Sequence, residues 1–135
     1  MRAGYSATPL ARKLSLKDGM RTWWEGMPDE VAAEILAEGV QLDRPERPEP
    51  PLDAAHAFVT RRAALSEAVG RLLPLLAPAG FLWVSWPKKA PGVATDITED
   101  VIREVALPVG LVDVKVCAVD ATWSGLKLMI RRERR

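Results

Sequence analysis

Residues 83–100 read Trp83-Val84-Ser85-Trp86-Pro87-Lys88-Lys89-Ala90-Pro91-Gly92-Val93-Ala94-Thr95-Asp96-Ile97-Thr98-Glu99-Asp100. An apolar run ends at a proline, and a loop with two lysines and a glycine follows. Threonine and aspartate then precede a segment that opens with acids, as the first turn of a helix does. The pattern predicts a strand–loop–helix unit, which is the repeating step of a parallel α/β sheet.

A second strand and an amphipathic helix come before this unit. Residues 52–59 are apolar without alternation, and so are residues 81–86, which indicates two strands covered on both faces. Between them, apolar residues recur at steps of three and four, with a kink or early end expected at Pro74. These helix residues are Leu65, Ala68, Val69, Leu72, Leu73 and Leu76. We place the two apolar strands at the centre of the sheet.

After the unit, the pattern predicts a helix from Ile97 or Thr98 to Val109 and then two alternating strands. Residues 111–119 carry Val112, Val114 and Val116 on one face, and residues 126–132 alternate in the same way. The short turn between these strands predicts an antiparallel hairpin at or near one edge of the sheet.

The first third of the chain is less regular. We expect a polar arm over residues 1–19 with a short helix after Thr8, a strand over 20–25, a helix from Pro28 to Gly39 and a short strand over 40–42. A proline-rich connector over 43–51 and a basic tail over 131–135 complete the chain. The whole chain predicts a single α/β domain over 1–135, with a mostly parallel sheet and helices on both faces.

Composition argues against several classes of function. A net charge of +1 gives the chain no overall attraction to nucleic acid or membrane, so we expect neither as a partner. A single cysteine excludes an intramolecular disulfide and, with a single histidine, argues against a metal site. No apolar run approaches 18 residues and no signal peptide is evident, so we expect a cytoplasmic protein.

The order strand, helix, strand, helix, hairpin over residues 52–132 resembles the second half of the Rossmann-like methyltransferases. As a whole, the chain also resembles a bacterial family designated a domain of unknown function. The motifs of that second resemblance include Gly4-Tyr5-Ser6, Phe58-Val59-Thr60-Arg61, Trp86-Pro87-Lys88-Lys89 and Val116-Cys117-Ala118-Val119-Asp120. This bacterial family supplies no activity.

The methyltransferase resemblance implies S-adenosylmethionine as cofactor and a set of residues to hold it. Those enzymes carry an acid and a glycine-rich turn after the first strand, where this chain has Glu25 and Gly26, and Asp43 stands where an acid binds the ribose. Met27 and Pro28 replace the small residues of that turn, and a proline removes an N–H donor. We therefore expect no cofactor and lean away from an enzyme.

The loop over 87–98 contains the ingredients of an anion site. Two lysines, a glycine and a helix start can converge on a phosphate or carboxylate. Because ligands of parallel sheets bind at the carboxyl ends of strands, we expect one ligand-binding edge. Its predicted residues are Lys88, Lys89, Thr95, Asp96 and Arg61. A solvated lysine pair beside ordinary helix caps is the alternative, and the acids Glu99 and Asp100 would repel an anion or pair with the lysines.

No residue is predicted to be catalytic. His56 lies within an apolar strand, where a packed core residue is the usual role, and Ser85 lacks the glycine-flanked elbow of serine hydrolases. Cys117 alternates within a strand and is expected to be a buried, inert thiol.

The sequence therefore favours a non-catalytic binding or regulatory module on a degenerate methyltransferase-like fold, with an anionic small molecule or a protein as partner. The alternative is a transferase that uses a nucleotide-derived cofactor such as S-adenosylmethionine. A third reading is a regulatory partner of a larger protein that binds through residues 43–51 and the basic tail.

Overall fold

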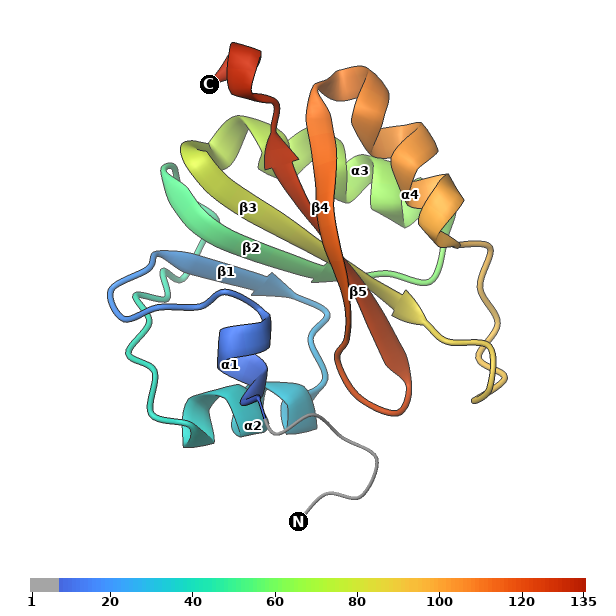
Figure 1. Cartoon of the computed structure of the whole chain (residues 1–135), viewed down its shortest axis with the longest axis horizontal. Helices are drawn as coiled ribbons and strands as arrows, with labels where there is room; N and C mark the ends of the chain where they lie inside the picture. The colour runs from blue at the N-terminus through green and yellow to red at the C-terminus, as the bar shows by residue number, and fades with distance from the viewer. Residues whose placement is uncertain (1–7) are drawn as a thin grey trace.

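The computed structural model describes residues 8–135, so the predicted motif Gly4-Tyr5-Ser6 lies outside the described residues. Nine helices and strands follow one another in this part of the chain (Figure 1). They are α1 Leu10–Lys13, β1 Thr22–Glu25, α2 Asp29–Ala37, β2 Leu52–Phe58, α3 Arg62–Leu72, β3 Leu76–Pro87, α4 Glu99–Ala106, β4 Leu111–Ala118 and β5 Trp123–Ile130. Short 3-10 turns at Leu73–Leu75, Leu107–Val109 and Arg132–Arg134 follow α3, α4 and β5.

The strands form one five-stranded sheet in the order β1-β2-β3-β5-β4. β1 pairs with β2 and β2 with β3 in parallel, whereas β5 is antiparallel to both β3 and β4. Four of the five strands therefore point in one direction, and the sheet is mixed. The prediction of an α/β fold is confirmed.

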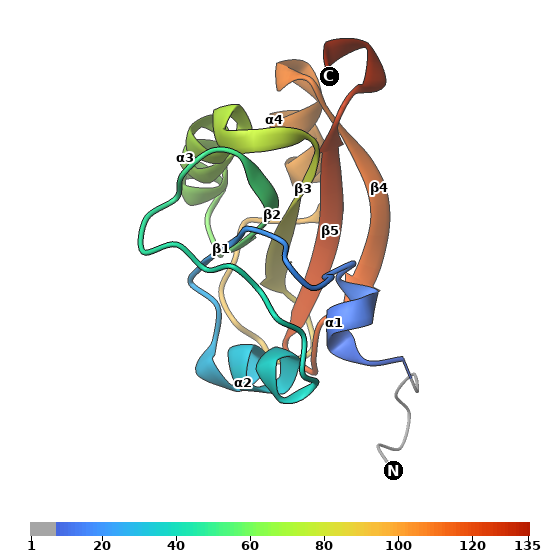
Figure 2. The same cartoon turned by 90° about the vertical axis from the view of Figure 1, so that its left-hand side faces the viewer.

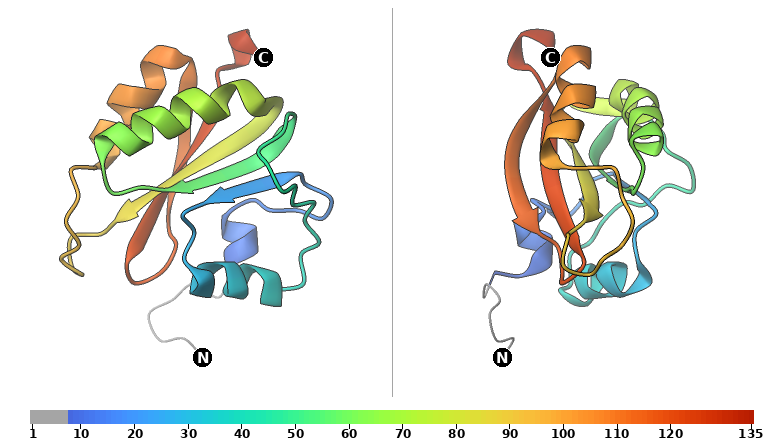
Figure 3. Two further views of the ribbon diagram at one scale, coloured as in Figure 1. Left: turned by 180° about the vertical axis from the view of Figure 1, so that it is seen from behind. Right: turned by 90° about the vertical axis from the view of Figure 1, so that its right-hand side faces the viewer.

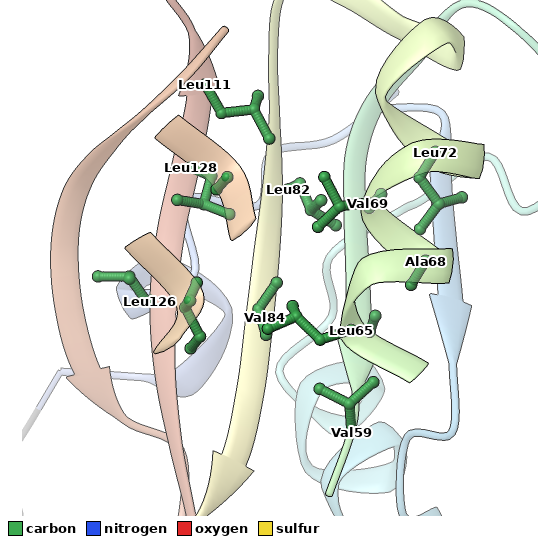
Figure 4. Packing of buried hydrophobic residues seen from close by; sticks show 14 of the residues in the cluster. Val59, Leu65, Ala68, Val69, Leu72, Leu82, Val84, Leu111, Leu126 and Leu128 are labelled. Carbon is green, nitrogen blue, oxygen red and sulfur yellow. The ribbon is translucent and has the colours of Figure 1, made fainter. Parts of the chain in front are cut away.

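Helices cover both faces of the sheet, and each face has its own hydrophobic core. α3 and α4 pack on one face, where Leu65, Leu72, Leu82, Ile102 and Leu128 are fully buried (Figures 2 and 4). α1 and α2 pack on the other face, against Phe58, Phe81 and Trp83. Because side chains alternate along a strand, β2 and β3 supply residues to both cores, as their continuous apolar sequence predicts.

The predicted strand at 40–42 is not formed. A single parallel bridge between Arg21 and Asp43 takes its place, and the residues from there to β2 form no helix or strand. The backbone N–H of Gln41 donates to the carboxylate of Asp18 at 2.8 Å instead of to a ladder, and the prolines that begin at Pro45 prevent pairing further along. The bridge lies on the side of β1 opposite β2, so the chain reverses its direction across the sheet at β1.

A bulge in β4 changes the predicted face of its valines. The pairing with β5 shifts between Asp113 and Lys115, which leaves Val114 as the extra residue. An extra residue reverses the alternation after it, so Val112 and Val116 lie on opposite faces, and the prediction of one valine face was wrong. All three valines are exposed, because β4 is the edge strand.

The basic tail binds the 3-10 turn Leu107–Val109, which follows α4. The guanidinium of Arg131 donates to the carbonyl of Leu107 at 2.9 Å, and that of Arg134 to the carbonyl of Val109 at 3.5 Å. Cations favour the carbonyl end of a helix, where backbone oxygens lack partners. No described helix is long and apolar enough to cross a membrane.

Candidate functional site

The first three strands end at the same edge of the sheet. The register pairs Glu25 of β1 with Ala57 of β2, and Phe58 of β2 with Ser85 of β3, so the three carboxyl ends lie side by side (Figure 3). The chain also reverses direction at β1, and open α/β sheets bind ligands outside the carboxyl ends beside such a reversal.

A cavity of about 550 Å³ opens at this edge, under the loop that joins β3 to α4. Trp86, Val93 and Ile97 form its apolar wall. Its polar lining consists of Lys88, Lys89, Thr95, Thr98 and Glu99. The volume lies within the range of sites for small molecules and cofactors.

The loop is fixed to the neighbouring helix by Thr95 and Asp96. The hydroxyl of Thr95 donates to the carbonyl of Thr60 at 2.7 Å, and the carboxylate of Asp96 accepts from the backbone N–H of Arg62 at 2.6 Å. Asp96 therefore caps α3, which lies 34 residues earlier, while Thr98 caps α4 by accepting from Val101 at 3.2 Å. A role for Asp96 in binding a ligand stays a prediction.

The two lysines of the loop differ in their contacts. Lys88 donates from its ammonium to the carbonyl of Asp120 at 2.7 Å, which ties the cavity to the β4–β5 turn. Lys89 is exposed, and its ammonium has no hydrogen bond or ion pair within residues 8–135. Arg61 occupies the N-cap position of α3 on the same edge, outside the lining of the cavity. Of the predicted ligand residues, the structure brings Lys88, Lys89 and Thr95 together.

The acids of the α4 start do not pair with the lysines. Arg103 binds Glu99 at 2.7 Å and Asp100 at 3.1 Å, and it also reaches Asp113 of β4 at 3.0 Å. The guanidinium thus holds both carboxylates, and Lys89 stays available beside the cavity.

Glu25, the predicted cofactor acid, is bound by its own neighbours. Both its oxygens accept from Arg71, at 2.5 and 2.8 Å, and the indole N–H of Trp23 donates to it at 2.7 Å. Hydrogen bonds from Arg71 lower the pKa of this carboxyl, although partial burial opposes the shift. Arg71 could not be identified from the sequence, because 46 residues separate it from Glu25.

The other two predicted cofactor residues lie apart from the cavity. Gly26 has a φ of +66°, and a Cβ there would stand 3.0 Å from the carbonyl oxygen of Phe58, so its turn is packed against β2. Asp43 pairs with Arg21 just before β1. Four residues of extended chain separate Arg21 from Glu25, which is roughly 13 Å at about 3.3 Å per residue. The structure does not bring Glu25, Gly26 and Asp43 into one site.

His56 and Ser85 form a buried pair, which the sequence analysis did not predict. The imidazole Nε2 lies 2.7 Å from the Ser85 hydroxyl, and the ring stacks on Phe58 with centroids 4.5 Å apart. Burial lowers the pKa of His56 to about 3, so the ring is neutral at physiological pH. Neither side chain lines the cavity, and the expectation of a packed core histidine agrees with this burial.

Comparison with solved structures shows what the fold is similar to. A SAM-dependent methyltransferase from Aquifex aeolicus matches with a TM-score of 0.62 at 14% identity, covering 90% of this chain and 88% of the other. The cyclase SpnF matches with 0.60 at 12% identity over 90% and 79%. The magnesium protoporphyrin IX methyltransferase from Synechocystis, solved with bound SAM, matches with 0.57 at 13% identity over 84% and 71%.

The fold is methyltransferase-like. No family model matches the sequence and no curated protein does, so the resemblance to a bacterial family of unknown function stays a prediction. The expected non-catalytic module, and the lean away from an enzyme, were wrong: the structural neighbours include several methyltransferases and favour the enzyme given as the alternative. The altered turn at Met27 and Pro28 was not sufficient reason to expect no enzyme, because a sheet of this kind can bind ligands along its whole carboxyl edge.

Proposed function

We propose that the chain is a transferase that uses S-adenosylmethionine, with the cofactor in the cavity at the carboxyl ends of the strands. One observation carries the proposal: the methyltransferase-like fold extends over 90% of this chain and 88% of a SAM-dependent methyltransferase. Fold alone does not fix a reaction, so the proposal rests also on the site.

The residues present fit such a cofactor at the cavity better than at the β1 turn. Trp86 and Ile97 offer an apolar wall of the kind that holds a purine ring, and the ammonium of Lys89 can receive a carboxylate. At the β1 turn, Glu25 is occupied by Arg71, and the space beside Gly26 is filled by the backbone of β2. Lys88 and Thr95 would hold the loop in place rather than bind the cofactor.

When bound, the cofactor supplies a methyl group on a sulfonium centre, and its transfer to an acceptor leaves S-adenosylhomocysteine. The chain's own residues position it: the loop over 88–98 shields one side of the cavity from water, and Asp96 and Thr95 anchor that loop to α3 and Thr60. Shielding of this kind strengthens electrostatic contacts inside a site.

Isothermal titration calorimetry with S-adenosylhomocysteine tests the proposal. We expect saturable binding with one ligand per chain, at least tenfold weaker in Lys89→Ala and unchanged in Arg47→Ala, an exposed cation of the connector. Absence of binding at millimolar ligand would overturn the proposed function. Binding that Lys89→Ala leaves intact but Glu25→Gln removes would move the cofactor to the β1 turn.

A further inference from the structure

Five lysines from distant parts of the sequence lie on the face of the sheet that carries α1 or at the carboxyl edge beside it. Lys13 and Lys17 belong to α1 and the turn after it, Lys115 to β4, Lys127 to β5, and Lys88 follows β3. The charges of Lys13, Lys115 and Lys88 all act on the thiol of Cys117, and those of Lys115 and Lys17 act on Lys127. We call this set the lysine row.

The centre of the row is a like-charge pair. Lys115 and Lys127 stand directly opposite each other in the antiparallel ladder of β4 and β5. Their ammoniums lie over the rings of Trp83 and Phe81, at 6.0 and 4.5 Å from the centroids, so both stems run along the same apolar surface. Like charges directly opposite on a sheet are destabilising, and such a pair needs a compensating partner.

No carboxylate within residues 8–135 pairs with any of the five lysines. Lys127 donates to the Ser15 hydroxyl at 3.0 Å, Lys13 to the carbonyl of Ala118 at 2.8 Å, and Lys88 to the carbonyl of Asp120 at 2.7 Å. The Asp120 carboxylate accepts from the N–H groups of Thr122 and Trp123. Partial burial, with Lys115 and Lys17 nearby, lowers the pKa of Lys127.

The backbone is also unusual beside Lys127. Ser15, which accepts its hydrogen bond, has a φ of +64°, the only positive φ at a residue other than glycine within residues 8–135. A left-handed conformation at such a residue is uncommon, and it turns the chain so that Ser15 meets Lys127 while Lys17 follows it. The arrangement gathers the cations rather than separating them.

The row is extended, and it ends at the cavity. From Lys115 to Asp120, where Lys88 is bonded, five residues of β4 and its turn span roughly 16 Å at about 3.3 Å per residue. One phosphate cannot reach both ends, whereas a chain of phosphates can. Lys88 also lines the cavity, so the row leads to the proposed site of transfer.

We propose that the lysine row binds the phosphate backbone of a nucleic acid and presents it to the cavity as the substrate of the proposed transferase. The net charge of +1 argued against such a partner, but it averages over the whole chain. Four of the five ammoniums lie on one face, and that of Lys88 lies at the adjoining edge. This substrate assignment rests on the proposed function, and the binding itself does not.

Fluorescence anisotropy with a labelled 12-nucleotide single-stranded RNA of mixed sequence tests the inference. Five phosphate contacts predict a slope of about −3.5 for log K against log salt, and a loss of about 100-fold between 50 and 200 mM salt. Lys115→Glu with Lys127→Glu removes two contacts, so we expect at least tenfold weaker binding at 100 mM and a slope near −2. Arg47→Glu with Arg132→Glu changes the net charge equally at two exposed positions and should leave the affinity within about twofold.

Three results would overturn the inference: no RNA binding at 50 mM salt, equal loss in both double variants, or a poly-glutamate peptide bound as tightly as RNA. Circular dichroism checks folding, and Lys115→Gln alone, expected to bind about threefold more weakly, replaces the double variant if that does not fold. Calorimetry with S-adenosylhomocysteine separates the two proposals. RNA binding without cofactor binding would support the lysine row as a nucleic-acid site and overturn the proposed transferase. Cofactor binding without RNA binding would support the transferase and overturn the nucleic-acid site.

Discussion

At the scale of single residues, charge placement opposes stability in one position of the sheet. Lys115 and Lys127 face each other with no acid between them, and an exposed like-charge pair of this kind weakens the fold slightly. Surface residues that lower the stability of the free protein are candidates for binding, because a bound anion relieves the repulsion between them.

Lys115→Glu should therefore stabilise the protein while it weakens RNA binding. Replacing repulsion by attraction across the ladder is expected to raise the free energy of unfolding by about 0.2–1 kcal/mol, less at high salt. Urea unfolding at 50 mM salt measures this change. Lys89→Glu, the same charge change at an exposed lysine outside the ladder, is the control and should stay within about 0.5 kcal/mol. A destabilised Lys115→Glu protein would contradict the strain assigned to this pair.

His56 makes the stability of the fold depend on pH. Its pKa is about 3 in the folded protein and about 6.5 in the unfolded chain, so only the unfolded chain takes up the proton between these values. Stability is full above pH 6.5 and falls as the pH decreases toward 3, with a loss of about 2 kcal/mol at pH 5.

Chemical unfolding of the wild type and His56→Gln at pH 7 and pH 5 tests this effect. Glutamine retains a polar group for Ser85 but cannot titrate. The free energy of unfolding of His56→Gln should therefore fall by about 2 kcal/mol less than that of the wild type between pH 7 and pH 5. Equal pH dependence in both proteins would show that His56 is not neutral and buried.

At the scale of elements, the loop between β3 and α4 caps two helices, α3 and α4. Asp96 caps α3 from the loop, and Thr98 caps α4 at the end of the same loop. The start of α3 and the wall of the cavity are therefore held by one carboxylate, which couples the stability of the helix to the shape of the site.

Asp96→Ala should lower the free energy of unfolding by about 1 kcal/mol through the lost cap, and Thr98→Ala by a similar amount. The two differ in their effect on the loop, because only Asp96 connects it to α3. Hydrogen exchange should show faster exchange at the α3 start and across residues 88–95 in Asp96→Ala, and at the α4 start alone in Thr98→Ala. Identical patterns in the two variants would mean that Asp96 does not anchor the loop.

At the scale of the whole molecule, the sheet presents a cofactor-sized cavity at one edge and a row of cations on the adjacent face. Lys88 belongs to both, since it lines the cavity and bonds to the β4–β5 turn. The proposed transferase and its proposed nucleic-acid substrate would need such an arrangement, with a small-molecule site and an extended row of cations next to each other.

A ligand of the cavity should stabilise the whole domain. S-adenosylhomocysteine at 100 times its dissociation constant is expected to add about 2.7 kcal/mol to the free energy of unfolding. Lys88→Ala with Lys89→Ala should lose most of this gain. Without ligand, the double variant should lose about 1 kcal/mol, because Lys88 gives up its hydrogen bond to Asp120 while the exposed Lys89 contributes little. Thermal unfolding with and without ligand measures both quantities, and an undiminished gain in the double variant would place the ligand elsewhere.

The sequence alone determined the elements and much of their arrangement. The continuous apolar runs at 52–59 and 81–86 formed parallel neighbours near the centre of the sheet, and the periodic residues from Leu65 to Leu72 formed α3. It also indicated that Lys88, Lys89 and Thr95 follow a strand at its carboxyl end. These features depend on local periodicity and on the alternation of strands with helices, which neighbouring residues specify.

Only the tertiary structure decided which distant residues meet. The opposition of Lys115 to Lys127 depends on the register and bulge of β4, the occupation of Glu25 depends on Arg71 from α3, and the cap of α3 comes from Asp96. Each is a contact between side chains that packing brings together, and a one-residue shift of register would exchange the faces of a strand. Local propensity does not specify such pairings. A chain with almost no net charge can therefore still place four lysines on one face and a fifth at the adjoining edge.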